Sequence, residues 1–362
     1  MNKKIKLFDP VINNREIQEI QKVIKSKFWA SGVGGNLVKK FENKFKNYIK
    51  TKEVVAVNSG TAALHLALSL TNIKNKEVIL PSLSFVSTAN AVLYNGGKPV
   101  FVDVDPISLC IDPNQVEKKI SKQTKIILPV HFAGLPSNLK KLKKMGRNYN
   151  ITLIEDAAHA CGSKFEGKKI GVHGDLVCFS FHPAKNLAMP SGGLIAINSP
   201  NFKIIKKILN AKRWCGITDR KDVNYDVKDL GWNFYMNEFS ASIGLVQLKK
   251  LDKLNKKRRT NVKRYHSEIN LESKMLYDND CSYHFYWILV KNRNELRKKL
   301  LRNNIEVGTH YKPIHQMSFY KNKSKLPVTE KVGNEIVTLP THPNLSNKDL
   351  DRIISLVNKY AR

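Results

Sequence analysis

Lys185 is the residue of this sequence best suited to nucleophilic chemistry. It lies in the run Phe179–Asn186 (FSFHPAKN), an apolar neighbourhood in a chain whose lysines mostly lie among other lysines. Burial in such surroundings lowers the proton affinity of an amine and leaves it able to attack a carbonyl. Such an amine is a usable nucleophile for a Schiff base, although one lysine alone is weak evidence for that chemistry. Ser180, five residues earlier, is placed to donate a hydrogen bond to a phosphate.

Asp156 and His159 lie in a second cluster, EDAAH, which ends a predicted strand at 152–155. A buried carboxylate is costly unless a cation meets it. A protonated pyridine nitrogen would be such a cation, and the ion pair would keep the ring an effective electron sink. Two structural roles remain open at this point, because Asp156 also suits a helix N-cap and His159 a hydrogen-bonded core histidine.

The run Asn58-Ser59-Gly60-Thr61 follows a predicted strand and begins a predicted helix. The free N–H groups and the dipole of a helix N-terminus favour a phosphate, and Gly60 permits a close approach. Taken alone, the turn is equally typical of an ordinary N-cap formed by Ser59. The presence of all three clusters in this order is stronger evidence for a site than any one of them.

Short apolar strands alternate with helical patterns over the first two-thirds of the chain. The predicted strands are 54–57, 78–80, 99–104, 126–130, 152–155, 176–181 and 194–197, and the predicted helices are 61–70, a segment ending near 94, 113–121 and 138–149. This alternation predicts an α/β domain with a mostly parallel sheet covered by helices on both faces. Active sites in such sheets lie beyond the carboxyl ends of the strands, where the three clusters fall.

The C-terminal third has a different character. A long helical stretch at about 237–269 precedes a sequence of strand, helix, strand and closing helix, predicted at 283–290, 295–303, 305–310 and 347–360. This order predicts a smaller α+β lobe. We place the domain boundary so that residues 1–254 form the large domain, with the N-terminal segment, and residues 255–362 the small one.

The chain is strongly basic. Lys and Arg number 62 against 30 Asp and Glu, a net charge of +32. The lysines are scattered through amphipathic stretches such as 137–148 and 246–259, which indicates a compositional bias on solvated faces. No basic stripe interleaved with aromatic residues is present, so we expect no nucleic-acid partner. A phosphate-bearing substrate is the functional interpretation of the surplus.

Cysteines and apolar segments indicate a cytoplasmic protein. The five cysteines form no CxxC pair and no zinc spacing, and a dispersed odd set fits a reducing compartment. The N-terminus lacks the apolar core of a signal peptide, and polar residues interrupt the most apolar window, 78–94, so we expect no membrane association. His310 and His315 are five residues apart across a proline and share no helical face, so we expect no metal site.

Seven motifs carry a resemblance to a known family. They are NSGTAALHLAL (58–68), PSLSFVSTANAVLYNGGKPVFVDVDP (81–106), PVHFAGLP (129–136), IEDAAHACGS (154–163), CFSFHPAKNL (178–187), GWNFYMNEFSASIG (231–244) and THYKPIH (309–315). The sequence resembles the sugar-nucleotide aminotransferases of the DegT/DnrJ/EryC1/StrS family over nearly its whole length. The resemblance implies the aspartate-aminotransferase fold, which is fold type I of the pyridoxal 5'-phosphate (PLP) enzymes.

The resemblance also implies roles for individual residues. Lys185 would bind PLP as the Schiff base and transfer the proton, Asp156 would pair with the pyridine nitrogen, and His159 would lie beside the phenolic oxygen. The remaining cofactor-binding residues would be Phe85 against the ring and Ser59, Gly60, Thr61, Ser180 and Asn233 around the phosphate. Because Asn233 would come from the other subunit, the resemblance implies a homodimer with shared active sites.

Three positions depart from the family pattern. Ser191 replaces the glutamate of a Gly-Glu-Gly-Gly run, Tyr235 replaces an arginine, and Cys215 replaces the histidine of an Arg-Asn-His-Gly run. None belongs to the Schiff-base machinery. We expect them to affect how the substrate and the amino donor are recognised.

The function expected from the resemblance is amination of a nucleotide-linked keto-sugar, with L-glutamate as donor. One alternative is dehydration of a sugar nucleotide by the PLP-dependent branch of the family that has a histidine in place of the lysine, and Lys185 argues against it. Another is a non-catalytic regulatory protein of the same fold, in which a degenerate site would be expected.

Overall fold

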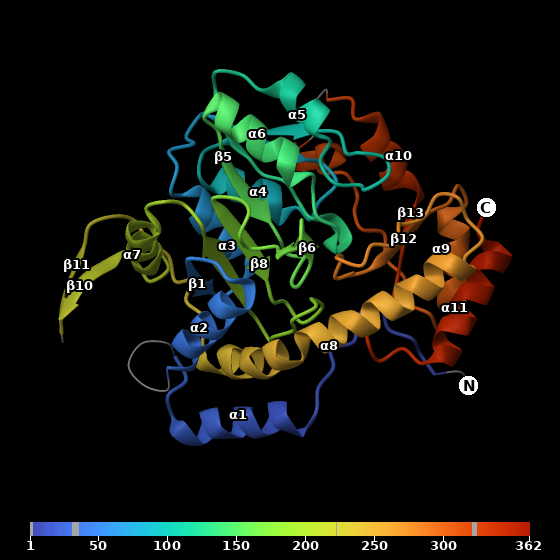
Figure 1. Cartoon of the computed structure of the whole chain (residues 1–362), viewed down its shortest axis with the longest axis horizontal. Helices are drawn as coiled ribbons and strands as arrows, with labels where there is room; N and C mark the ends of the chain where they lie inside the picture. Colours follow the sequence, from blue (N-terminus) through green and yellow to red (C-terminus); the bar gives the residue numbers. More distant parts are fainter. Residues whose placement is uncertain (1–2, 31–35, 222, 321–323) are drawn as a thin grey trace.

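A seven-stranded sheet forms the centre of the computed structural model, which describes residues 3–30, 36–221, 223–320 and 324–362 (Figure 1). Its strands, in the order β1-β9-β8-β5-β4-β2-β3, are β1 (Glu53–Val57), β9 (Gly193–Ile197), β8 (Leu176–Ser180), β5 (Thr152–Asp156), β4 (Thr124–Ile127), β2 (Glu77–Pro81) and β3 (Lys98–Val102). β9 is antiparallel to both of its neighbours, and the other pairs are parallel. The mostly parallel sheet is therefore confirmed.

Helices cover both faces of the sheet, because its strands are apolar on both sides. Val54 and Ala56 of β1 belong to the apolar core on one face of the sheet, to which α2 (Leu37–Ile49), α5 (Pro113–Lys119) and α6 (Leu139–Tyr149) contribute. Val55 and Val57 belong to the apolar core on the other face, to which α3 (Gly60–Leu68), α4 (Ser87–Tyr94) and α7 (Phe202–Lys212) contribute. This two-sided burial is why the strands have nearly continuous apolar sequences.

The C-terminal elements form a second apolar core beside the sheet. They are α8 (Glu238–Glu268), β12 (Tyr286–Leu289), α9 (Arg293–Arg302), α10 (Pro327–Glu335), β13 (Ile336–Leu339) and α11 (Asn347–Tyr360). Figure 1 shows α8 running from beneath the large sheet to this second core. The predicted boundary at 254/255 falls inside α8, so the two-domain division remains a prediction.

The predicted strand at 305–310 is wrong. This segment makes only two isolated bridges, from Ile305 to Ile5 and from Gly308 to Thr338. Since its two ends pair with different partners, no continuous ladder forms. The strand predicted at 283–290 begins only at Tyr286, because Tyr283 has a left-handed backbone conformation with φ of 48°.

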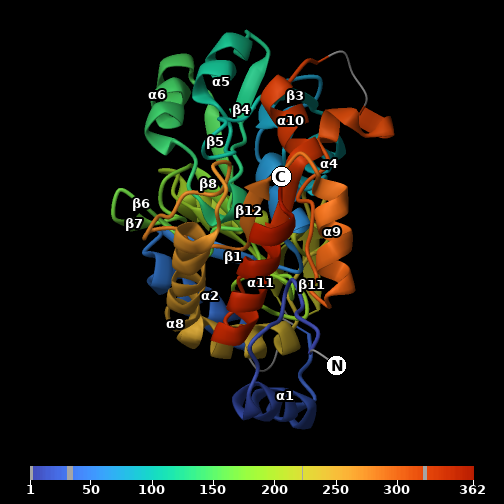
Figure 2. The same cartoon turned by 90° about the vertical axis from the view of Figure 1, so that its right-hand side faces the viewer.

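Several elements were not predicted. They are α1 (Asn14–Ser26), α2, α7, α10, β13, and the short hairpins β6 (Lys164–Phe165)–β7 (Lys168–Lys169) and β10 (Ile217–Lys221)–β11 (Asn224–Val227). Figure 2 shows α1 at one end of the molecule and α5 and α6 at the other. Among the described residues, no helix combines the length and the apolar character needed to cross a membrane.

Candidate active site

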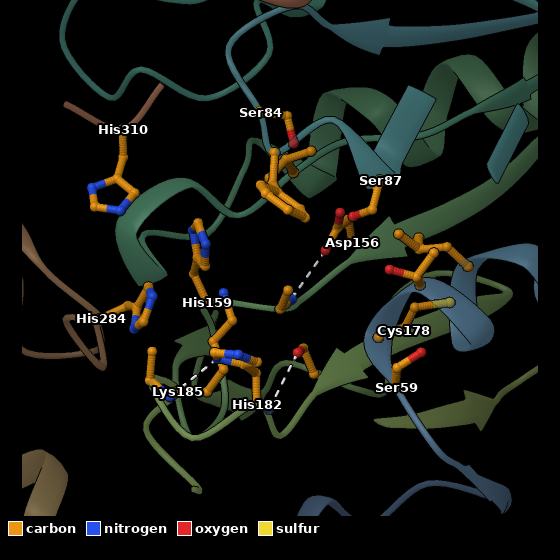
Figure 3. Close-up of a pocket in the computed structure, with 18 of the residues that line it drawn as sticks. Ser59, Ser84, Ser87, Asp156, His159, Cys178, His182, Lys185, His284 and His310 are labelled. Atoms are coloured by element: carbon orange, nitrogen blue, oxygen red, sulfur yellow. Dashed lines mark hydrogen bonds between the residues drawn. The ribbon is translucent and has the colours of Figure 1, made fainter. Parts of the chain in front are cut away.

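A cavity of about 420 Å³ lies beyond the carboxyl ends of β1, β5 and β8 (Figure 3). The predicted site residues that line it are Ser59, Gly60, Thr61, Phe85, Asp156, His159, Ser180 and Lys185. Asn233 is not among its lining residues. Its side chain is exposed, and its main-chain oxygen accepts a hydrogen bond of 3.3 Å from Nδ2 of Asn58 in the same chain.

Lys185 extends into this cavity from the loop that follows β8. Burial lowers the pKa of its amine to about 8, and the charge of Asp156 opposes part of that shift. The next residue, Asn186, anchors the loop by donating to Oδ1 of Asn255 at 3.0 Å and to the main-chain oxygen of Ser282 at 2.8 Å. A lysine with this lowered pKa supplies neutral amine close to physiological pH, as Schiff-base chemistry requires.

Asp156 ends β5 and is 4% exposed. Its Oδ2 accepts a hydrogen bond of 2.9 Å from the Thr88 hydroxyl, and its Oδ1 accepts one of 3.1 Å from the N–H of Ala158. Burial raises the pKa of Asp156, while these hydrogen bonds and the charge of Lys185 oppose the rise. Turns rather than a helix follow it, so Asp156 is not a helix N-cap.

His159 faces the cavity with one ring nitrogen engaged. Its Nε2 lies 3.1 Å from the Tyr311 hydroxyl, and its Nδ1 is buried with no hydrogen-bond partner among the described residues. Burial, with Lys185 nearby, holds the pKa of His159 well below its usual value, so the ring is neutral. Only one of its two ring nitrogens therefore has a hydrogen-bond partner, which suits a residue whose other nitrogen binds a ligand.

The turn before α3 fulfils both roles considered for it. The Ser59 hydroxyl caps the helix by accepting from the N–H of Ala62 at 3.1 Å, and Ser59, Gly60 and Thr61 also line the cavity. A Cβ at Gly60 would lie 2.7 Å from Cβ of Ser180, so the close contact between helix and strand admits only glycine. The first turn of the helix directs its free N–H groups and its dipole at this end of the cavity.

These three features match three functional groups of PLP. The lysine matches the aldehyde, the buried carboxylate matches the pyridine nitrogen, and the helix N-terminus with Ser180 matches the phosphate. Among the described residues, Asp156 has no ion-pair partner within 4.0 Å, so its buried charge calls for a cation in the cavity. The fold and the site together define a PLP-dependent enzyme of fold type I.

Comparison with known proteins identifies the family. Residues 10–358 match the DegT/DnrJ/EryC1/StrS aminotransferase family, and the chain belongs to it. GDP-perosamine synthase of Escherichia coli O157:H7 is 32% identical over 366 residues, which cover 99% of each chain.

Two solved structures show the same fold over nearly the whole chain. Helicobacter pylori PseC, an aminotransferase involved in the biosynthesis of pseudoaminic acid, is 27% identical with a TM-score of 0.91, over 99% of each chain. Spr1654 from Streptococcus pneumoniae, in its PLP form, is 26% identical with a TM-score of 0.91, over 99% of this chain and 98% of that one. The present protein, as a member of this family, uses PLP as its cofactor.

Of the three departures from the family pattern, only Ser191 lines the cavity, and its hydroxyl donates to the main-chain oxygen of Asn58. Tyr235 instead lines a separate basic depression, to which Arg213 also belongs. Cys215 is exposed, and its N–H donates to the main-chain oxygen of Trp232 at 3.0 Å.

Sequence reasoning missed Thr88, Tyr311, Phe8 and His284 as site residues. Thr88 lies within the apolar window 78–94, and Tyr311 lies within the motif THYKPIH, but neither was predicted to belong to the site. A polar residue inside an otherwise apolar stretch was the available signal for Thr88.

The two histidines considered for a metal site have different hydrogen-bond partners. His310 bonds to Thr338, and His315 bonds to Ser82 and Glu330.

Proposed function

We propose that this enzyme transfers the amino group of L-glutamate to the keto group of a nucleotide-linked sugar. The observation that carries the proposal is the meeting of Lys185, Asp156 and the α3 N-terminus in one cavity of a DegT/DnrJ/EryC1/StrS family member. The name of GDP-perosamine synthase, the relative that is 32% identical, supports a nucleotide-linked sugar as substrate.

Bound PLP supplies the electron sink that makes the α-proton of an amino acid removable. The amine of Lys185, with its lowered pKa, accepts that proton and returns it to the cofactor side, acting as a positioned general base and acid. Asp156 would keep the pyridine nitrogen protonated, and its two hydrogen bonds hold the carboxylate in place for that task. His159 would fix the phenolic oxygen, and Phe85 would cover the ring.

The substrate is doubly anionic at its diphosphate, and the charge of +32 favours the approach of such a molecule. The product, an amino sugar, would enter the biosynthesis of a cell-surface polysaccharide. We place the enzyme in the cytoplasm, where its five free cysteines would stay reduced.

The active form would be a homodimer in which each subunit completes the site of the other. The exposed side chain of Asn233, outside the cavity of its own chain, supports its use by a partner. The aromatic side chains on either side of it, Trp232 and Phe234, stack at 6.0 Å and lie against His65. They therefore hold the segment rigidly while leaving the amide outside.

Incubation with a panel of nucleotide keto-sugars and L-glutamate tests the proposal. Mass spectrometry should show an amino sugar and 2-oxoglutarate in equal amounts, and no product with Lys185→Ala. A product that has lost water without gaining nitrogen would instead indicate a dehydratase. No turnover of any sugar by a PLP-loaded protein would favour the regulatory alternative.

A further inference from the structure

His284 belongs to the wall of the cavity, although the chemistry proposed above does not use it. It is 3% exposed and precedes β12 in the C-terminal core. Its ring stacks on that of His159 at 4.5 Å and 29°, and on that of Phe8 at 5.0 Å and 15°. Figure 3 shows His284 and His159 on the side of the cavity away from Asp156.

The imidazole of His284 has hydrogen-bonding capacity that the protein leaves unused. Its Nδ1 is buried without a partner, and its Nε2 makes no hydrogen bond to any residue that the structure describes. The main chain holds the residue instead, since its N–H donates to the oxygen of Ala133 at 2.8 Å. An enclosed polar ring without partners is costly unless a ligand meets it.

The charges near His284 favour an anionic ligand. Burial, then Lys185, His159, Arg258 and His310, hold the pKa of His284 well below its usual value, so the ring is neutral and donates one N–H. Arg258 is 5% exposed, and burial lowers its pKa to about 10. It donates to the Thr341 hydroxyl at 3.4 Å, but no carboxylate of the described residues pairs with it within 4.0 Å.

Arg258 does not line the cavity itself but lies behind His284, because the Thr341 hydroxyl that accepts its hydrogen bond is 3.3 Å from the main-chain oxygen of His284. Its charge and that of Lys185 make the surroundings of the His284 ring positive. The charge of Lys185 is balanced in part by Asp156 on the other side, whereas that of Arg258 has no counter-ion among the described residues. A carboxylate beside this ring would receive a hydrogen bond from His284 and would supply the missing negative charge.

We propose that His284 determines specificity for the amino donor by binding the carboxylate attached to its reacting carbon. That carbon must reach the amine of Lys185 to exchange its proton, and its carboxylate is bonded directly to it. The stacked rings of His159 and His284 border the same cavity as Lys185. This inference rests on the proposed function in one respect, namely that the donor is an α-amino acid.

The first half-reaction tests this inference without any sugar. PLP-loaded enzyme is mixed with L-glutamate or with 4-aminobutyrate, which keeps the amine and the distal carboxylate but lacks the carboxylate on the reacting carbon. The change in cofactor absorbance gives a rate constant and a half-saturation concentration for each amine. His284→Phe keeps the ring stack and removes both nitrogens, whereas His284→Gln keeps a donor and removes the ring.

With His284→Phe, we expect the rate constant divided by the half-saturation concentration to fall about 10- to 100-fold for L-glutamate. The same ratio for 4-aminobutyrate should change by less than about threefold, and His284→Gln should retain part of the preference for L-glutamate. His173→Gln is the matched control, because this half-buried histidine also has an unpartnered Nδ1 but lies outside the cavity. It should change neither ratio.

Two results would overturn the inference. One is a His284→Phe enzyme with the wild-type preference, and the other is an equal fall for both amines, which would indicate a purely structural ring. If the Phe variant does not bind PLP, the same comparison with His284→Leu decides. A wild-type enzyme that reacts with L-glutamate yet aminates no keto-sugar would overturn the proposed function and leave this inference intact.

Discussion

The hydroxyl of Thr88 donates a hydrogen bond of 2.9 Å to Oδ2 of Asp156. The hydroxyl of Ser84 lies 2.8 Å from that of Thr88, so two side chains of the segment after β2 support the carboxylate that ends β5. Since Oδ1 accepts from the N–H of Ala158, both oxygens of Asp156 are oriented by the protein itself. The carboxylate is thus preorganised for a cation in the cavity.

Replacing Thr88 by valine tests this support. The change keeps the shape and removes the hydroxyl, so Asp156 loses one of its two hydrogen bonds. We expect PLP to bind about tenfold more weakly, corresponding to ~1.4 kcal/mol for a hydrogen bond to a charged group. Titration of the cofactor-free protein with PLP measures the effect. Thr260→Val, at an exposed position of α8, is the control and should bind PLP as the wild type does.

Asp156→Asn should nearly abolish turnover without unfolding the protein. The amide cannot hold a proton on the pyridine nitrogen, so the electron sink is lost. The rate of the first half-reaction should fall about 10²–10⁴-fold, as is typical for the loss of such an electrostatic contribution. Stopped-flow absorbance measures the rate, and thermal melting checks the fold. A loss of less than about tenfold would show that Asp156 only supports the structure.

The parts of the site predicted from the sequence are those carried by local motifs at strand ends. Asp156 is the last residue of an apolar strand, Ser59 and Lys185 follow two others, and parallel strands bring their carboxyl ends to one edge of a sheet. The strands themselves were predictable because burial on both faces makes their sequences apolar throughout.

The parts that were missed depend on contacts distant in sequence. Phe8 reaches the cavity because Ile5 pairs with Ile305, about 300 residues away, and nothing in the N-terminal sequence indicates that bridge. His284 becomes a wall residue only when its ring stacks on His159. The strand predicted at 305–310 was wrong for the same reason, since its apolar pattern does not reveal that its two ends pair with different partners.

The pKa of Lys185 gives the attachment of PLP a defined pH dependence. Burial lowers this pKa from 10.5 to about 8, so the amine is mostly protonated below pH 8 and mostly neutral above it. Since only the neutral amine attacks the aldehyde, the rate of attachment to cofactor-free protein should rise with pH and level off above about 8. Stopped-flow absorbance between about pH 6 and 10 follows it.

Asp156 affects the midpoint of this pH–rate profile. Its negative charge raises the pKa of Lys185, so Asp156→Asn should move the midpoint of the rate profile to lower pH. Borohydride reduction followed by peptide mapping should place the cofactor on Lys185 in both proteins. A midpoint near the ordinary lysine value of about 10.4 would show that the amine is solvated rather than buried.

Asn233→Ala tests the residue that the structure leaves outside its own cavity. If the amide binds the phosphate of PLP, the variant should bind PLP more weakly by about 1–3 kcal/mol. Titration with PLP measures the loss. Asn279→Ala is a suitable control, because Asn279 is also exposed and its side chain accepts from Tyr277 at 2.9 Å in the C-terminal lobe. Unchanged affinity would remove Asn233 from the proposed site.

Mixing the inactive Lys185→Ala variant with the impaired Asn233→Ala variant decides which subunit supplies Asn233. In a mixed dimer of Lys185→Ala and Asn233→Ala chains, an Asn233 that serves the partner puts both lesions in one site and leaves the other site wild type. Activity should then rise above that of either variant alone. If Asn233 serves its own chain, as its contact with Asn58 would allow, one site lacks the lysine and the other lacks the amide, so neither is intact. The absence of any rise, with subunit exchange demonstrated by differently tagged chains, would contradict the shared site and place both residues in the cavity of a single chain.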